Sequence, residues 1–147
     1  MPSQAEFQTL ANKRLEEART LRSAGHHEAA FYLAGYAVEC GLKSAVCKTL
    51  QIDIFNLSTD IHRPFKTHRL DYLIVLAGLS KQLADDIAND ASVSVAANSF
   101  VNAPSGVDRW LAWSEELRYN VTGCSPMVCQ EFVNNVDRFL VWLRNHW

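Results

Sequence analysis

Three neighbouring side chains late in the chain, Arg118, Tyr119 and Asn120, are of types that bind nucleotides. An arginine guanidinium holds a phosphate through two N–H groups, and a tyrosine ring stacks on a base. An acidic pair that includes Glu115 precedes this run, so a second interpretation stays open. In it, Arg118 binds a nearby carboxylate, that of Glu39 or Glu115. Tyr119 then fills the core.

The densest group of basic side chains in the chain comprises His62, Arg63, Lys66, His68 and Arg69. It lies beside the start of a helix that we expect from Thr67. Backbone N–H groups at a helix N-terminus add positive potential that suits a phosphate. The functional interpretation is therefore a phosphate or RNA contact. The alternative is a solvated loop whose charges are balanced by nearby acids such as Asp60 and Asp71.

The elements that hold these side chains centre on residues 26–50, which predict one long helix that is apolar on nearly every side. A surface helix keeps one wet face, so we expect other helices to wrap this one. Its internal charges are Glu39 and Lys43, four residues apart with the acid first, which is the favoured order for a helical pair. Buried charges must be paired, and a satisfied pair is our main interpretation. The alternative is a polar contact for a ligand, in a groove between helices or at a dimer seam.

Two local signals predict a helix over residues 3–24 that forms a hairpin with the central helix. Ser3 and Glu6 have the spacing of a capping box. Gly25 can adopt the left-handed conformation that ends a helix. Residues 51–66 lack a sustained period and are rich in turn formers, so they predict a long loop.

The second half of the chain predicts shorter helices and one long C-terminal helix. We expect short helices from Thr67 and from Ser80, and residues 91–106 as partly helical or loop. Asp108 is expected to begin a turn or short helix. Ser125 is the predicted cap of the last helix, with Pro126 in its first turn. We interpret the tryptophans as packing or subunit contacts rather than stacking platforms: Trp110, Trp113, Trp142 and Trp147.

No segment alternates as a strand does, so the sequence predicts an all-α fold. We expect one domain over residues 1–147, an antiparallel four-helix up-and-down bundle with one or two short extra helices. The hydrophobic content of 48% allows a core of its own. The formal net charge of −2 gives no overall attraction for nucleic acid, so any such binding needs a local basic patch.

The composition favours a cytoplasmic protein with reduced thiols and no cofactor. Four cysteines, at positions 40, 47, 124 and 129, match no strong zinc spacing and are interpreted as buried thiols. The N-terminal residues lack the pattern of a signal peptide, and no apolar run is long enough to span a membrane. Asp85, Asp86 and Asp90 form an acidic helix edge without a second ligand group, so we expect no metal. Serine, histidine and aspartate are present, but nothing groups them as a hydrolase triad.

Three segments together resemble the HEPN domain family, named for its occurrence in higher eukaryotes and prokaryotes. They are AAFYLAGYAVECGLK in the central helix, THRLDYLIVLAGL from Thr67, and WLAWSEELRYN from Trp110 followed by a helix that ends WLRNHW. They cover most of the chain in the expected order. The resemblance implies an antiparallel four-helix bundle with a short extra helix that forms a homodimer, often encoded beside a nucleotidyltransferase-type partner protein. It also implies a role as a metal-independent ribonuclease in toxin–antitoxin or defence systems, or as a module that binds nucleotide, RNA or the partner.

The sequence departs from the ribonuclease members of that family, which carry an Arg, four to six residues, and then a His at the start of the last long helix. Arg118 stands near that place, but no histidine occurs between His68 and His146. The residue that would exchange protons with the ribose hydroxyl or the leaving oxygen is missing there. We therefore favour a binding module that uses Arg118, Tyr119, Asn120, Lys43, Glu39, Arg63, Lys66, His68 and Arg69. Two alternatives stay open: a ribonuclease whose displaced histidine is His68, with Arg63 or Arg118, and a purely structural partner-binding dimer.

Overall fold

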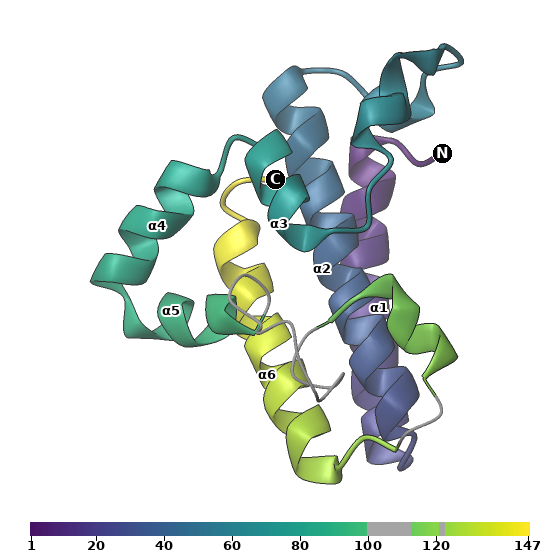
Figure 1. Cartoon of the computed structure of the whole chain (residues 1–147), viewed down its shortest axis with the longest axis vertical. Coiled ribbons are helices and arrows are strands. Elements are labelled where there is room, and N and C mark those ends of the chain that lie inside the picture. Colours follow the sequence, from purple (N-terminus) through teal and green to yellow (C-terminus); the bar gives the residue numbers. More distant parts are fainter. Residues whose placement is uncertain (100–112, 121–122) are drawn as a thin grey trace.

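The computed structural model describes residues 1–99, 113–120 and 123–147, and within these ranges the chain contains helices and no strand. The prediction of an all-α protein is confirmed. Three long helices dominate: α1 (Gln4–Ser23), α2 (His27–Leu50) and α6 (Pro126–Leu143). Figure 1 shows α1 antiparallel to α2, and α6 running in the same direction as α2 along its length.

The α1–α2 hairpin forms where the sequence predicts it. The Ser3 hydroxyl accepts a bond from the backbone N–H of Glu6, and the Glu6 carboxylate accepts one from the backbone N–H of Ser3. Gly25 has φ +86°, a left-handed conformation that costs a glycine little. The predicted capping box and hairpin turn are therefore confirmed.

Helix α2 is sheathed by its neighbours, as its composition predicts. Every residue from 37 to 47 is buried, which is about three complete turns and includes all faces of the helix. The absence of a side chain at Gly41 lets α6 approach, because a Cβ there would lie 2.7 Å from Leu143 Cδ2. Nearer the start of both helices, the Phe31 and Phe132 rings stack with centroids 3.7 Å apart.

Among the described residues between α2 and α6, the elements are short. They are the 3-10 helices η1 (Ile54–Asn56) and η2 (Asp60–Phe65), then α3 (Leu70–Leu76), α4 (Ser80–Asn89), α5 (Ala91–Asn98) and the 3-10 helix η4 (Glu115–Tyr119). Residues 51–66, expected as a loop, thus contain two 3-10 segments, and the first of them buries the apolar side chains of Ile54 and Phe55. Helix α4 begins at Ser80 itself, and Leu79 is its N-cap residue.

Helix α6 starts as predicted, with Pro126 in the first turn and the Ser125 hydroxyl accepting from the backbone N–H of Val128. Trp113 and Trp142 are buried, in agreement with a packing role. The expectations for Asp108 and Trp110 fall outside the described residues. The antiparallel four-helix bundle stays a prediction, since the elements described between α2 and α6 are short.

The four cysteines are buried and none is in a disulfide, as the sequence predicts. Burial raises the pKa of the Cys40 thiol to about 12 and also raises the pKa of Cys47 and Cys129. These thiols stay protonated at neutral pH and are therefore poor nucleophiles. Within the described part of the chain, no helix is long and apolar enough to cross a membrane.

Candidate functional site

A buried ion pair lies near the middle of α2. The Lys43 ammonium donates to Glu39 Oε1 at 2.6 Å, and the two side chains are 7% and 1% exposed. The predicted helical pair is thus confirmed. The Phe55 ring of η1 lies 5.6 Å from the ammonium and closes the pair from one side. Both charges need their partner, because an unpaired charge at this depth would be costly.

His68 connects this buried pair to the surface. Its Nδ1 lies 3.0 Å from the same Oε1 atom of Glu39, and its side chain is 51% exposed. A carboxylate only accepts hydrogen bonds, so Nδ1 carries the proton of this contact. The ring therefore presents its other nitrogen, Nε2, on the side away from Glu39. A histidine oriented in this way by a carboxylate can exchange a proton or donate one to an anion.

Two other polar side chains of α2, Tyr36 and Cys40, interact with the carboxylate of Glu39. Burial raises the pKa of Tyr36 to about 12, with the Cys40 thiol and Glu39 as further causes. Burial likewise raises the pKa of Cys40, and Glu39 adds to the effect. Both groups therefore stay neutral at physiological pH, and they contribute polarity but no charge to the site.

Arg118 and Tyr119 form a second cluster against α2. The Arg118 guanidinium lies 4.9 Å from the centroid of the Tyr119 ring, and Tyr119 is 67% exposed. The nearby Tyr119, and after it Tyr32 of α2, raise the pKa of Arg118. Tyr119 therefore does not fill the core. The carboxylate of Glu39 is bound by Lys43 and His68. It is therefore not the partner of Arg118, as one interpretation of the sequence suggested.

Trp113 fixes this second cluster to the helix. Its indole N–H donates to the backbone carbonyl of Tyr32 at 2.9 Å. The ring occupies the space that a side chain at position 35 would need, because a Cβ built on Gly35 collides with the indole. Gly35 thus allows η4 to approach α2, and η4 carries Arg118 and Tyr119.

The two clusters lie on one face of α2. Tyr32, Glu39 and Lys43 are separated by seven and four residues, close to two turns and one turn of a helix. The rise per residue places Tyr32 and Glu39 roughly 10 Å apart along the axis. In Figure 1, η4 lies against the lower half of α2, and the segment that leads into α3 crosses α2 higher up. Residues distant in sequence are thus brought to one helix face.

The remaining basic candidates are placed differently. Arg63 pairs with Asp60 at 3.1 Å, and Arg69 pairs with Asp71 at 2.6 Å while its guanidinium stacks 3.9 Å from the Tyr72 ring centroid. Asp60 and Asp71 thus offset part of the positive charge of the two arginines. This agrees with the interpretation of the basic group as a solvated loop balanced by nearby acids. Exposed Lys66 lies two residues before His68. Asn120 caps η4, and its backbone N–H donates to the carbonyl of Leu117.

No family model, no curated protein and no solved structure matches this chain. The site is therefore argued from its own geometry. The sequence interpretation did not single out Tyr32, and it gave Trp113 a packing role without placing it against Gly35. The signal for Tyr32 was present, because its spacing from Glu39 and Lys43 repeats at helical turns. Trp113 carried no such signal, since its contact with Gly35 joins segments that are far apart in sequence.

The acidic edge of α4 is occupied by protein partners. Asp85 pairs with Lys81, Asp86 accepts from the Trp142 indole at 2.7 Å, and Asp90 caps α5. Among the described residues, no group of three or more His, Cys, Asp or Glu side chains is arranged to hold a metal ion.

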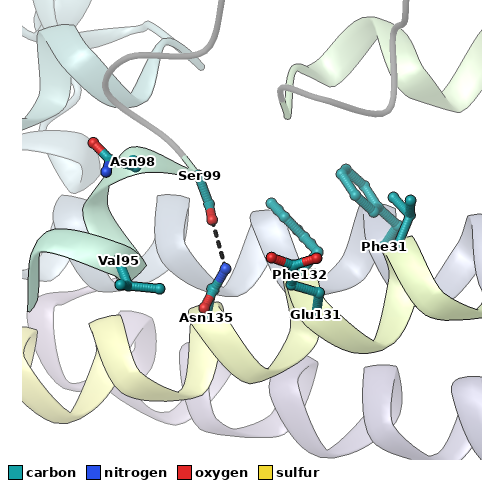
Figure 2. Close-up of a pocket in the computed structure, with 8 residues that line it drawn as sticks. Phe31, Val95, Asn98, Ser99, Glu131, Phe132 and Asn135 are labelled. Atoms are coloured by element: carbon teal, nitrogen blue, oxygen red, sulfur yellow. Dashed lines mark hydrogen bonds between the residues drawn. The ribbon is translucent and has the colours of Figure 1, made fainter. Parts of the chain in front are cut away.

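A cavity of about 340 Å³ lies between α5 and α6, away from the predicted site residues. Figure 2 shows Asn135 inside it, with its amide nitrogen donating to the Ser99 hydroxyl at 2.9 Å. Phe31 and Phe132 line the opposite part of the same cavity. None of the residues proposed for nucleotide or RNA binding lines it, so it plays no part in the function argued below.

Proposed function

We propose that this chain is a HEPN-like module that binds phosphate groups of RNA or of a nucleotide on one face of α2. The observation that carries the proposal is the alignment of two clusters on that face. Glu39, Lys43 and His68 form one, and Arg118 with Tyr119 forms the other. The segments involved are the same ones that carry the family resemblance.

The charges of this face suit a small anionic ligand. The Glu39 carboxylate is balanced by Lys43, so Arg118 and Lys66 supply the positive potential. An arginine binds a phosphate with two donors. The exposed ring of Tyr119 offers a stacking surface for a base, which is how single-stranded RNA is usually held.

The same proposal includes the oligomeric state, the location and the partner of the chain. The chain forms a cytoplasmic homodimer with the four-helix arrangement of the family, without the usual Arg–His ribonuclease pair. A nucleotidyltransferase-type partner protein and a toxin–antitoxin or defence role accompany it. The experiment below also tests the contrary hypothesis, that the chain is a purely structural partner-binding dimer.

One observation favours a second candidate, a metal-independent ribonuclease that uses His68. The Glu39–His68 bond at 3.0 Å orients an imidazole toward the surface, as a general base requires. His68 Nε2 would remove the ribose 2′-hydroxyl proton, and that oxygen would attack the adjacent phosphorus. The 5′ oxygen would leave with a proton taken from water, giving a 2′,3′-cyclic phosphate and a 5′-hydroxyl end. Cleavage of RNA by the wild type, lost in His68→Asn, would establish this candidate.

The binding proposal is tested by the salt dependence of RNA affinity. A fluorescent single-stranded RNA oligonucleotide is titrated with the protein at several salt concentrations, and anisotropy is recorded. Binding that weakens steeply with salt indicates phosphate contacts. Arg118→Ala should reduce both the affinity and the salt slope, whereas Arg144→Ala, at the far end of α6, should change neither. Absent or salt-independent binding would favour the structural dimer.

A further inference from the structure

The net charge of the phosphate-binding face depends on one group, His68. In the buried part of the site, the Glu39 carboxylate and the Lys43 ammonium cancel. His68 is the next group outward, bonded to the same carboxylate oxygen and half exposed. The net charge beside a bound phosphate is therefore set by whether this imidazole is neutral or cationic.

The hydrogen bond to Glu39 determines what His68 can offer a ligand. Nδ1 faces the carboxylate at 3.0 Å, and a carboxylate accepts only, so Nδ1 holds a proton in both charge states. A neutral ring then presents a lone pair at Nε2, which repels phosphate oxygens. A cationic ring presents an N–H at Nε2, which donates to them. Only the cationic form can make a favourable contact.

We propose that this site binds phosphate together with a proton: cationic His68 donates from Nε2 to the ligand, and buried Glu39 is the positioning residue that holds the imidazole for that contact. This inference rests on the proposed function, since it assumes a phosphate ligand on this face. It adds that affinity falls as the pH rises through the range in which imidazoles titrate.

The named neighbours of His68 keep one charge state between pH 5.5 and 8.5. On α2, burial raises the pKa of both Tyr36 and Cys40 to about 12, so these two stay neutral. On the histidine's own segment, Lys66 and Arg69 are of types that stay cationic. At the start of α3, the Arg69 side chain holds the pKa of Asp71 below its usual range, so Asp71 stays anionic.

The experiment measures the affinity of the full chain from pH 5.5 to 8.5 at constant salt. One probe is a single-stranded uridine oligonucleotide with a 5′-hydroxyl, which contains only phosphodiesters. The wild-type affinity for it should fall by up to about tenfold per pH unit above the imidazole titration, because one proton is bound with the ligand. The other probe is uridine 5′-monophosphate, whose phosphate loses its second proton near pH 6. Its affinity should pass through a maximum if the site takes a terminal phosphate.

Three variants separate the role of His68 as a donor from the role of Glu39 as its positioning residue. His68→Asn keeps a donor for Glu39 but has no group at the Nε2 position, so its affinity should be about tenfold lower at pH 5.5 and independent of pH. Glu39→Gln keeps an acceptor but lacks the counter-charge, so its pH profile should shift to lower pH. His26→Asn is the matched control, because exposed His26 lies at the start of α2, away from Glu39, and its profile should equal the wild type's.

The outcomes distinguish proton-coupled binding from the proposed phosphate-binding function. Binding that falls with pH in the wild type and in His26→Asn, but not in His68→Asn, supports proton-coupled binding. Wild-type binding that is the same at every pH overturns the coupling and leaves the proposed function standing. An unchanged pH profile in folded Glu39→Gln overturns the role of Glu39. No binding of either probe at any pH overturns the proposed function itself.

Discussion

The imidazole of His68 and the carboxylate of Glu39 are joined by a 3.0 Å hydrogen bond across 29 positions of sequence. One side chain is half exposed and the other is 1% exposed. The bond therefore links the interior of the sheathed helix α2 to its surface. It extends a buried ion pair to a side chain that is half exposed to solvent.

Glu39→Ala should lower the free energy of unfolding by roughly 3–5 kcal/mol, because it leaves the buried Lys43 ammonium without its partner. Urea denaturation of the folded chain measures this. The double variant Glu39→Leu with Lys43→Met should recover most of the loss, since no charge is then buried. Equal stability of Glu39→Ala and the wild type would mean that the Lys43 charge is satisfied by water instead.

Gly35→Val should displace Trp113 from α2, because even a Cβ at position 35 collides with the indole ring. We expect a stability loss of about 1–3 kcal/mol from overpacking and weaker RNA binding, since η4 carries Arg118 and Tyr119. Hydrogen exchange at residues 115–119 should become faster, while exchange in the α1–α2 hairpin near Gly25 should not change. Unaltered exchange in η4 would show that Trp113 does not hold this segment.

Tyr119→Ala should weaken binding of a single-stranded RNA oligonucleotide roughly tenfold, the size expected for one lost base stack. The chain provides a matched control in Tyr72, which is 50% exposed and also has an arginine, Arg69, stacked on its ring. Tyr72→Ala should leave the affinity within twofold. Equal losses in the two variants would argue against a base site at Tyr119 specifically.

The elements with local signals could be predicted from the sequence. Ser3 with Glu6, Ser125 with Pro126, and Gly25 mark boundaries through the conformation of a few residues. The sheathing of α2 also followed from its composition. Residues 51–66 were harder, because Ile54 and Phe55 are buried by contacts that short-range periodicity does not report.

The candidate site likewise has a part that local sequence spacing predicts and a part that it does not. The Glu39–Lys43 pair followed from the favoured four-residue spacing on a helix. Its contact with His68 and the seating of Trp113 on Gly35 join separate segments. Such contacts depend on how helices pack, and a single sequence does not specify them. The site residues were therefore predicted by type, and their grouping became visible only in the fold.

The free energy of unfolding should fall as the pH rises above about 9. Burial raises the pKa of Cys40 from 9.0 to about 12 and that of Tyr36 from 10.0 to about 12. A pKa that is higher in the folded state stabilises fully below the unfolded value, and this contribution is lost as pH rises through the folded value. Urea unfolding at pH 8 to 11 measures the decline. Cys40→Ala should show a shallower decline than the wild type, and an equal slope would contradict the assignment to this thiol.

An NMR titration of the isotopically labelled chain with a single-stranded RNA oligonucleotide tests the central claim most directly. At pH 6 and low salt, the largest shift changes should occur at Glu39, Lys43, His68, Arg118 and Tyr119. Amides around the α5–α6 cavity, such as Asn135, should change little. Changes confined to other surfaces, or none at saturating RNA, would contradict a phosphate-binding face on α2.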